Sequence, residues 1–310
     1  MPVSTMPLHI ATPLIESRPL SLAAGCEVWA KMEALQPSGS FKIRGIGAAC
    51  AHHAAHGKRR FVSSSGGNAG LAVAYAGRRL GVPVTVVVPE TTSATARELI
   101  AREEADLVVH GASWQEANAR ALALVDAETA FLHPFDDPLL WAGHASMIDE
   151  AVAAGLPFDA VVVSVGGGGL MAGVAEGLAR HGRSAVPIVA VETEGAASLA
   201  AAIRAGAPVE LPAITSLATS LGAKRVCDRA FRLTKTRPVH SVTVTDGAAV
   251  AACTRFLADH RVLVEPACGA ALAVLYDRHE VLAPFRRVLA IACGGATATV
   301  AQLQAWQAAG

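Results

Sequence analysis

Residues 160–170 read AVVVSVGGGGL. The first five are a β-branched, apolar run typical of a strand buried on both faces of a sheet, and a helical pattern follows to about Arg180. Four successive glycines cost backbone entropy and contribute no packing. We therefore expect their N–H groups to form a nest for a phosphate. A close contact between helix and sheet is the plainer structural explanation.

The same alternation of strand and helix recurs from residue 61 onward. Strands are predicted at 61–64, 84–88, 107–110, 160–164, 188–192 and 287–292, and helices at about 68–80, 93–104 and 170–180, with a last one through 308. Ser113 and Glu116 have the spacing of a capping box, which opens another helix. Continuous apolar strands separated by helices indicate parallel sheets covered on both faces. The predicted fold class is α/β, with two open, mostly parallel twisted sheets flanked by helices.

The length of 310 residues suggests two domains. We place a small domain at 45–135 and a large one at 1–44 and 136–310. Hydrophobic residues make up 52% and charged ones 17%, which indicates an ordered chain with an apolar core. The net charge is zero, so no basic face for nucleic acid is expected.

Location is judged from three sequence features. The first twenty residues show no basic segment followed by an apolar one, so no secretory signal is expected. The longest uncharged run, 160–175, is interrupted by glycines and is shorter than the roughly 18 apolar residues of a membrane span. The six cysteines form no C-x-x-C pair and suit free thiols. We expect a soluble, cytoplasmic protein.

A lysine is the candidate catalytic residue. Residues 37–45 read PSGSFKIRG, which places Lys42 just ahead of a helical pattern. A desolvated, deprotonated ε-amine can form a Schiff base with an aldehyde. A single lysine is usually a solvated surface residue. The glycine-rich turns that follow strands elsewhere in the chain favour the covalent role.

Two further turns carry candidate ligand-binding residues. Residues 64–70 read SSGGNAG between a strand and a helix, where free N–H groups and hydroxyls suit a substrate carboxylate, although a capped tight turn has the same sequence. Cys293 follows an apolar strand and begins the stretch CGGAT. The carboxyl end of a parallel strand faces the crevice in which ligands of such sheets bind. A buried structural thiol is the commoner occurrence.

A dinucleotide site is an alternative for the glycine turn. Gly167, Gly169 and Ala172 satisfy G-x-G-x-x-A, and Glu192 lies about 20 residues later, where an acid that binds ribose is found. That match is easily met by any glycine-rich turn. It also gives Lys42 and the asparagine turn no function.

Taken together, the motifs resemble the fold-type-II pyridoxal-phosphate enzymes, which resemble the tryptophan synthase β chain. The similarity is greatest to the L-serine/L-threonine dehydratases that carry a cysteine. It covers nearly the whole chain in order, from 38–45 and 64–70 through PFDDP at 134–138, GHAS at 143–146 and the glycines at 166–169 to VEPACG at 264–269 and CGG at 293–295. The resemblance implies a cofactor bound in the cleft between the two domains.

Roles for individual residues follow from this resemblance. It implies that Lys42 is the Schiff-base lysine and the catalytic base. The cofactor would be held by Phe41, Lys42, Asn68, Gly166, Gly167, Gly168, Gly169, Leu170 and Cys293. The substrate carboxylate would be held by Ser65, Gly66, Asn68 and Ala69. A monovalent cation such as K⁺ would be bound by the Glu192 side chain and by the carbonyls of Ala196, Leu221 and Ala223.

The activity implied is deamination of L-serine, and of L-threonine, to a 2-oxo acid and ammonia by a homodimeric lyase. Serine racemases place a hydroxyl two residues before the motif asparagine, but Gly66 stands there, which disfavours racemisation. Ala69 in place of histidine also fits the serine-dehydratase branch. A β-replacement enzyme of the cysteine synthase type, a nicotinamide oxidoreductase and a cofactor-binding protein without catalysis are the other possibilities.

Overall fold

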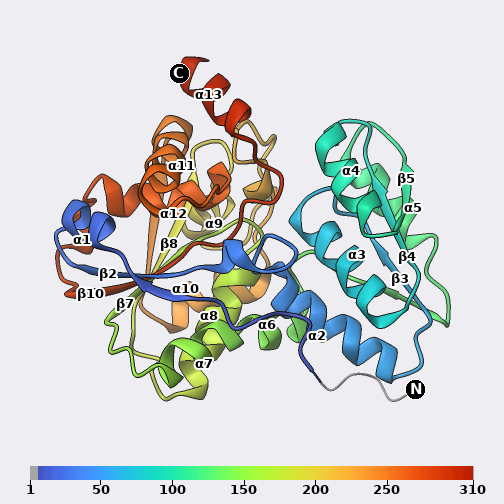
Figure 1. The fold of residues 1–310 in the computed structure, drawn as a ribbon, viewed down its shortest axis with the longest axis horizontal. Helices are drawn as coiled ribbons and strands as arrows, with labels where there is room; N and C mark the ends of the chain where they lie inside the picture. Colours follow the sequence, from blue (N-terminus) through green and yellow to red (C-terminus); the bar gives the residue numbers. More distant parts are fainter. Residues whose placement is uncertain (1–5, 310) are drawn as a thin grey trace.

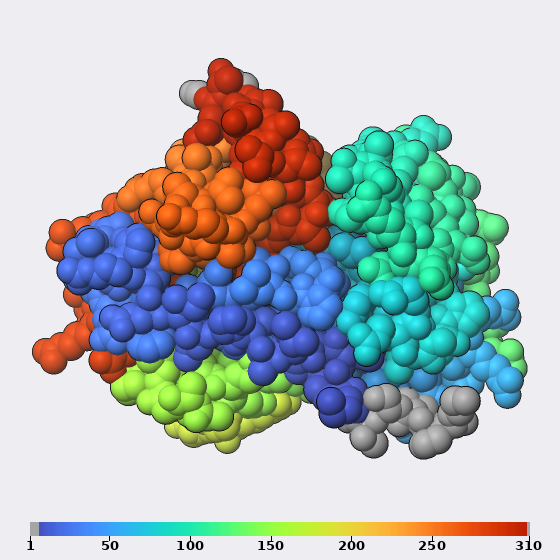
Figure 2. All heavy atoms as spheres, viewed as in Figure 1, coloured from blue at the N-terminus to red at the C-terminus, as the bar shows by residue number. Residues whose placement is uncertain are grey.

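The computed structural model describes residues 6–309, which form two α/β bodies side by side (Figure 1). Positions 1–5, which belong to the predicted large domain, and position 310 lie outside the described residues. In the space-filling view the two bodies touch along a seam that ends in a notch beside the last, red segment of the chain (Figure 2). No helix within residues 6–309 combines the length and apolar character needed to cross a membrane.

The larger sheet contains strands from both ends of the described chain. Its order is β1-β2-β10-β7-β8-β9, and β1 alone runs antiparallel to its neighbour. The strands are β1 (Leu14–Glu16), β2 (Glu27–Lys31), β7 (Ala160–Ser164), β8 (Ile188–Thr193), β9 (Val239–Val244) and β10 (Arg287–Ile291). Every residue of β7 and β8 is buried, because helices cover both faces of the sheet centre. Because both faces are buried, the sequences of these two strands are continuous apolar runs, which is why they could be predicted.

The smaller sheet is wholly parallel, in the order β5-β4-β3-β6. Its strands are β3 (Arg60–Ser63), β4 (Val84–Val88), β5 (Asp106–Val109) and β6 (Thr129–Phe131). Neighbouring side chains point to opposite faces, so Phe61 and Val86 pack with one group of helices. Val62 and Val87 pack with Ala117 on the other face.

The helices surround these sheets, and α12 packs on β7, β8 and β10 of the larger one. The α-helices are α1 (Arg18–Ala24), α2 (Lys42–Ala55), α3 (Asn68–Leu80), α4 (Ala94–Arg102), α5 (Trp114–Leu122), α6 (Pro138–His144), α7 (Ser146–Ala153), α8 (Gly169–Arg180), α9 (Ser198–Ala205), α10 (Asp228–Thr236), α11 (Asp246–His260), α12 (Pro266–Tyr276) and α13 (Val300–Ala309). The 3₁₀ turns are η1 (Glu33–Leu35), η2 (Thr219–Leu221) and η3 (Glu280–Leu282).

The fold class and each strand predicted from the sequence are confirmed to within one or two residues. The capping box is confirmed as well, because Ser113 and Glu116 bond each other's backbone N–H groups at the start of α5. Three-residue β1 and β6 were not predicted, being too short to show a period. The strand β2 was not predicted because its sequence EVWAK begins and ends with a charged residue. The strand β9 was not predicted because only one of its residues, Val242, is buried at this edge of the sheet.

A glycine sets the separation of α11 and α12. A Cβ at Gly269 would lie 2.1 Å from the carbonyl oxygen of Ala249 and 2.6 Å from Cys253 Sγ. Gly247, at the start of α11, has open space at the same position, its nearest neighbour being Thr245 at 3.9 Å. Packing therefore requires glycine at 269 but not at 247.

We predict that Gly269→Ala lowers the free energy of unfolding by about 1–3 kcal/mol, because a backbone oxygen cannot move aside for the new methyl group. Gly247→Ala is the matched control. It should leave stability unchanged or raise it by up to about 1 kcal/mol, since alanine favours the helix. Thermal and urea unfolding of the two variants measure the difference. Equal effects would contradict the packing argument.

Candidate active site

The loop before α2 pairs with the turn after β10. Phe41 N–H donates to the Cys293 carbonyl at 2.9 Å, and Gly295 N–H donates to the Gly39 carbonyl at 3.1 Å. Ser40 and Gly294 form an antiparallel bridge between these two bonds. A Cβ at Gly294 would lie 2.7 Å from Ser40 Cβ, so the close pairing needs glycine. Two predicted site segments, about 250 residues apart in sequence, are thereby brought together.

Lys42 is the first residue of α2 and lies beside this pairing. Its Nζ donates to the Pro134 carbonyl at 2.5 Å and lies 5.2 Å from the centre of the Phe41 ring. Burial lowers the pKa of the Lys42 amine to about 8, while Cys293 and Glu265 act in the opposite direction. At neutral pH a useful fraction of this amine is unprotonated, which a nucleophile or general base requires.

A buried ion network holds the first turn of α2. Arg44 is fully buried, and its guanidinium contacts Glu33 at 2.6 Å and Glu150 at 2.6 Å. Lys31 of β2 also pairs with Glu150, at 2.5 Å. Two buried cations are thus matched by two carboxylates, which offsets much of the cost of removing charge from water. The network joins β2, η1 and α7 to the helix that carries Lys42.

The turn at 64–70 leads from β3 into α3, as predicted. Asn68 is 7% exposed, and its Nδ2 donates to Glu265 Oε1 at 2.6 Å. Ser65 Oγ accepts the Gly67 N–H at 3.3 Å. A Cβ at Gly66 would lie 2.7 Å from the Thr92 side chain, so Thr92 occupies the space that a serine would need. Ala69 is buried in the core under the turn.

The four glycines form a surface without side chains at the start of α8. Gly168 has φ +93°, a left-handed conformation that favours glycine. A Cβ at Gly167 would lie 2.3 Å from the Phe135 ring, and one at Gly169 would lie 2.6 Å from the Phe135 carbonyl oxygen. Close packing therefore also explains the tetrad. The N–H groups at the start of the 12-residue α8 still lack intrahelical acceptors, which suits an anion.

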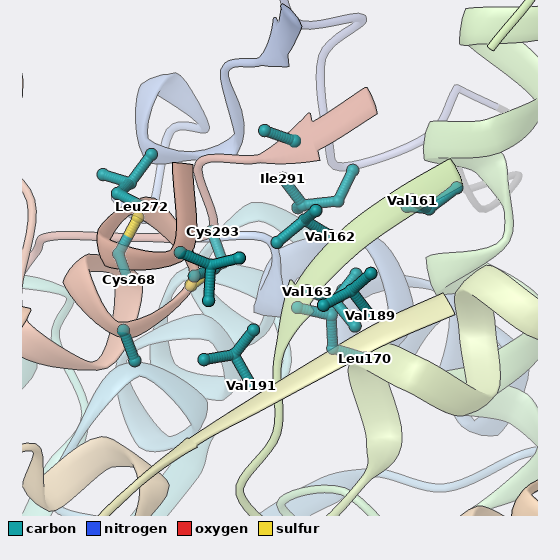
Figure 3. Packing of buried hydrophobic residues seen from close by; sticks show 14 of the residues in the cluster. Val161, Val162, Val163, Leu170, Val189, Val191, Cys268, Leu272, Ile291 and Cys293 are labelled. Carbon is teal, nitrogen blue, oxygen red and sulfur yellow. The ribbon is translucent and has the colours of Figure 1, made fainter. Parts of the chain in front are cut away.

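Cys293 lies two residues after the end of β10, inside the larger core and beside Cys268 (Figure 3). A hydrogen bond with Cys268 and burial both raise the pKa of the Cys293 thiol well above its usual value. The side chain is therefore a neutral thiol at physiological pH. All six cysteines are free, as the sequence predicted.

No role for Glu265 was predicted from the sequence, although it belongs to the motif VEPACG at 264–269. It is 5% exposed, and its Oε2 accepts the Thr297 hydroxyl at 3.0 Å in addition to the Asn68 bond. Burial raises the pKa of this carboxyl, and its hydrogen-bond donors act against the shift. The surrounding sequence is apolar, so only its neighbours in space identify Glu265 as part of the site.

Leu221, one of the residues predicted to bind a cation, lies against Gly166 of the glycine turn. Glu192 is fully buried, and its oxygens accept the N–H groups of Leu199 and Ala200 at 2.7 and 2.8 Å. Burial raises the pKa of this carboxyl to about 7. A Cβ at Gly166 would lie 2.9 Å from Leu221 Cα, and the Leu221 carbonyl accepts the Ala223 N–H at 2.7 Å. Helix capping of α9 is therefore one established role of Glu192.

The site has the features that a phosphate-bearing aldehyde cofactor needs. In the described part of the chain, several buried polar atoms lack a hydrogen-bond partner, and four of them belong to the segments above: Ser38 Oγ, Ser40 Oγ, Asn68 Oδ1 and Ser164 Oγ. Unsatisfied buried polar atoms are costly and commonly mark a place where a ligand binds. The reactive amine, the neutral thiol and the free N–H groups of α8 complete a donor set that fits such a group.

Comparison with known proteins agrees with this arrangement. Residues 5–294 match the family described as "Pyridoxal-phosphate dependent enzyme". The chain belongs to this family of pyridoxal-phosphate enzymes. It is 48% identical to a mouse (Mus musculus) protein named "Serine dehydratase-like", over 97% of this chain and 95% of that one. It is 46% identical to human (Homo sapiens) "L-serine dehydratase/L-threonine deaminase", over 98% and 96% of the two chains.

Solved structures show the same fold. A fungal L-serine ammonia-lyase from Rhizomucor miehei superposes with a TM-score of 0.92 at 34% identity, covering 97% of this chain and 98% of that one. Maize serine racemase superposes with a TM-score of 0.88 at 24% identity, covering 97% and 92%, which is a likeness of fold alone.

We predict that Arg44→Met lowers the free energy of unfolding by about 3–5 kcal/mol, because buried Glu33 loses its closest cation and is left with Lys31 at 4.0 Å. The matched control is Arg102→Met, which removes an exposed pair with Glu98 on α4. That change should alter stability by no more than about 0.5 kcal/mol. Urea unfolding measures the stability of both variants. Similar losses of stability would contradict a larger contribution from the buried ion network than from an exposed ion pair.

We predict that the protein freed of cofactor binds pyridoxal phosphate at a rate set by the Lys42 amine. Because burial lowers the pKa to about 8, the rate should rise about tenfold per pH unit below 8 and level off above it. The growth of visible absorbance after mixing measures this rate. Nα-acetyl-lysine is the control, and its rate should keep rising to about pH 10. A protein profile that follows the control would contradict the shifted pKa.

Proposed function

We propose that the chain is a lyase that releases ammonia from L-serine, and also from L-threonine, leaving pyruvate or 2-oxobutyrate. The observation that carries this proposal is the position of the Lys42 amine, with a pKa of about 8, beside the neutral thiol of Cys293. Support comes from the names and the 46–48% identity of relatives that span nearly all of this chain.

Each part of the site has a proposed binding role. Lys42 would hold the cofactor through its aldehyde carbon, with Phe41 packed against the ring. The phosphate would lie on the N–H groups of 166–170, at the start of α8. Asn68 would contact the ring hydroxyl, and Cys293 would face the ring nitrogen. The turn at 65–69 would bind the substrate carboxylate, for which Ser65 supplies a hydroxyl and the start of α3 supplies N–H groups.

The bound cofactor draws electrons from the substrate and makes its Cα proton acidic. The Lys42 amine takes that proton, because its lowered pKa of about 8 leaves about a tenth of it unprotonated at pH 7 and more at higher pH. The Cys293 thiol stays neutral and supplies no negative charge to hold a proton on the ring nitrogen. This favours rapid loss of the β-hydroxyl over long storage of negative charge at Cα.

The structure gives an argument against racemisation. That reaction needs a second proton donor on the face of the substrate opposite Lys42, and Gly66 has no side chain to provide it. Thr92 fills the space in which a serine at 66 would stand. A β-replacement activity of the cysteine synthase type is the second candidate, because it would use the same lysine and the same carboxylate turn.

Other expectations extend this proposal. The domain division at 45–135, a homodimer and a cytoplasmic location stay predictions. A K⁺ ion is proposed at the Glu192 carboxylate with the carbonyls of Ala196, Leu221 and Ala223. Its support is that Glu192 is fully buried without a cationic partner within 4 Å in the described part of the chain, while its oxygens retain free lone pairs.

We predict that the protein loaded with pyridoxal phosphate releases ammonia from L-serine and L-threonine, and that Lys42→Ala reduces turnover at least 10³-fold, since both a covalent anchor and a base are lost. Lys58→Ala is the control, because that amine only contacts the Ala127 carbonyl at the surface. Ammonia and 2-oxo acid are measured with L-serine, L-threonine and D-serine.

Two results would contradict the assignment. Turnover by Lys42→Ala within tenfold of the unchanged protein would exclude Lys42 as the base. Product formation that depends on an added thiol or sulfide would indicate β-replacement instead of deamination.

A further inference from the structure

Glu265 stands where three segments of the site meet. It is the residue before α12, and its backbone N–H donates to the Gly294 carbonyl at 3.1 Å. Its own carbonyl accepts the N–H groups of Cys268 and Gly269 at 2.8 and 2.9 Å. The backbone is thus fixed between α12 and the turn that pairs with the Lys42 loop.

The carboxylate does not cap its own helix. It makes no hydrogen bond to the N–H groups at the start of α12. Oε1 instead accepts Asn68 Nδ2 at 2.6 Å, from a residue 197 positions away in the other body of the molecule, and Oε2 accepts the Thr297 hydroxyl at 3.0 Å. Among the described residues no cation pairs with Glu265 within 4 Å. A buried carboxylate without a cation is costly, and helix capping does not explain this one.

The contact fixes which way the Asn68 amide faces. Both oxygens of Glu265 act as acceptors, Oε1 for the Asn68 amide nitrogen and Oε2 for the Thr297 hydroxyl. The amide nitrogen must therefore face Glu265, and the Oδ1 atom must point elsewhere. Asn68 Oδ1 is buried and has no partner in the described part of the chain. Turning the amide over would place two acceptor oxygens 2.6 Å apart, which is strongly unfavourable.

We propose that Glu265 is a positioning residue that holds the Asn68 amide in one orientation for the pyridoxal-phosphate ring. It acts on the ring through Asn68 and need not touch it. The inference rests on the proposed function, in which Asn68 contacts the ring hydroxyl. Glu265 also joins Asn68 to the segment after Cys293, through its backbone N–H to Gly294 and its Oε2 to Thr297.

A double-mutant cycle on cofactor affinity tests this inference. Glu265→Ala, Asn68→Ala and the double variant are titrated with pyridoxal phosphate, and the dissociation constant is read from visible absorbance. We expect Glu265→Ala to weaken binding about tenfold or more in the unchanged background, the size of a lost hydrogen bond to a charged group. In the Asn68→Ala background the same change should have less than a threefold effect, because the residue through which Glu265 acts is gone.

Other variants separate positioning from general stability. Glu265→Gln keeps an acceptor oxygen for Asn68 and should bind the cofactor within about threefold of the unchanged protein. Glu280→Ala removes an exposed glutamate of η3 and should have no effect. If Glu265→Ala does not fold, Glu265→Met fills the space without an acceptor and takes its place in the cycle. Melting temperatures of the cofactor-free variants report any structural loss separately.

The outcomes distinguish the two proposals. A protein that gains no visible absorbance with pyridoxal phosphate, before any substitution, overturns the proposed cofactor site and the Glu265 inference together. A protein that binds the cofactor but loses affinity equally from Glu265→Ala in both backgrounds overturns the positioning role alone. Unchanged affinity and an unchanged absorption spectrum in Glu265→Ala do the same.

Discussion

The site depends on the backbone pairing between residues 39–41 and 293–295. Two hydrogen bonds and one bridge place the start of α2 against the end of β10, so that Lys42 and Cys293 lie together. Gly294 permits the close approach, because a side chain there would meet Ser40. The ion network of Arg44 then holds the same turn of α2 from the opposite side. The position of the amine is thereby set by β10 and by the network, and not by α2 alone.

Burial acts differently on the ionisable groups of this region, and the difference follows from their partners. Lys42 has only a backbone carbonyl to accept its proton, so removal from water lowers its pKa. Arg44 is fully buried but meets two carboxylates, so its charge is retained. The Cys293 thiol has a second thiol and apolar neighbours, which keep it neutral. One low-dielectric region thus supplies an amine with a lowered pKa, a neutral thiol and a permanent cation within one helical turn and its neighbours.

Most of the fold, and part of the candidate site, could be predicted from local sequence patterns. The apolar runs of β7 and β8 and the capping box of α5 each express a local rule, and the structure agrees with them. The strands β1, β6 and β9 are short or exposed, so their pairing is decided by distant partners. The same limit applies to Glu265. Its importance comes from Asn68, which is 197 residues away, and no periodicity in the chain records such a contact.

The space beside position 66 depends on two residues and not on one. Gly66 has no side chain, and Thr92 occupies the volume that a side chain there would need. The Cβ of any side chain introduced at 66 would lie 2.7 Å from Thr92, closer than real Cβ atoms approach such neighbours. Thr92 carries a hydroxyl of its own, and its Oγ1 would lie 2.7 Å from that Cβ, so a serine at 66 would compete with Thr92 for this space. Because the two positions lie in different loops, after β3 and after β4, packing between these loops limits which residues the turn at 64–70 can carry.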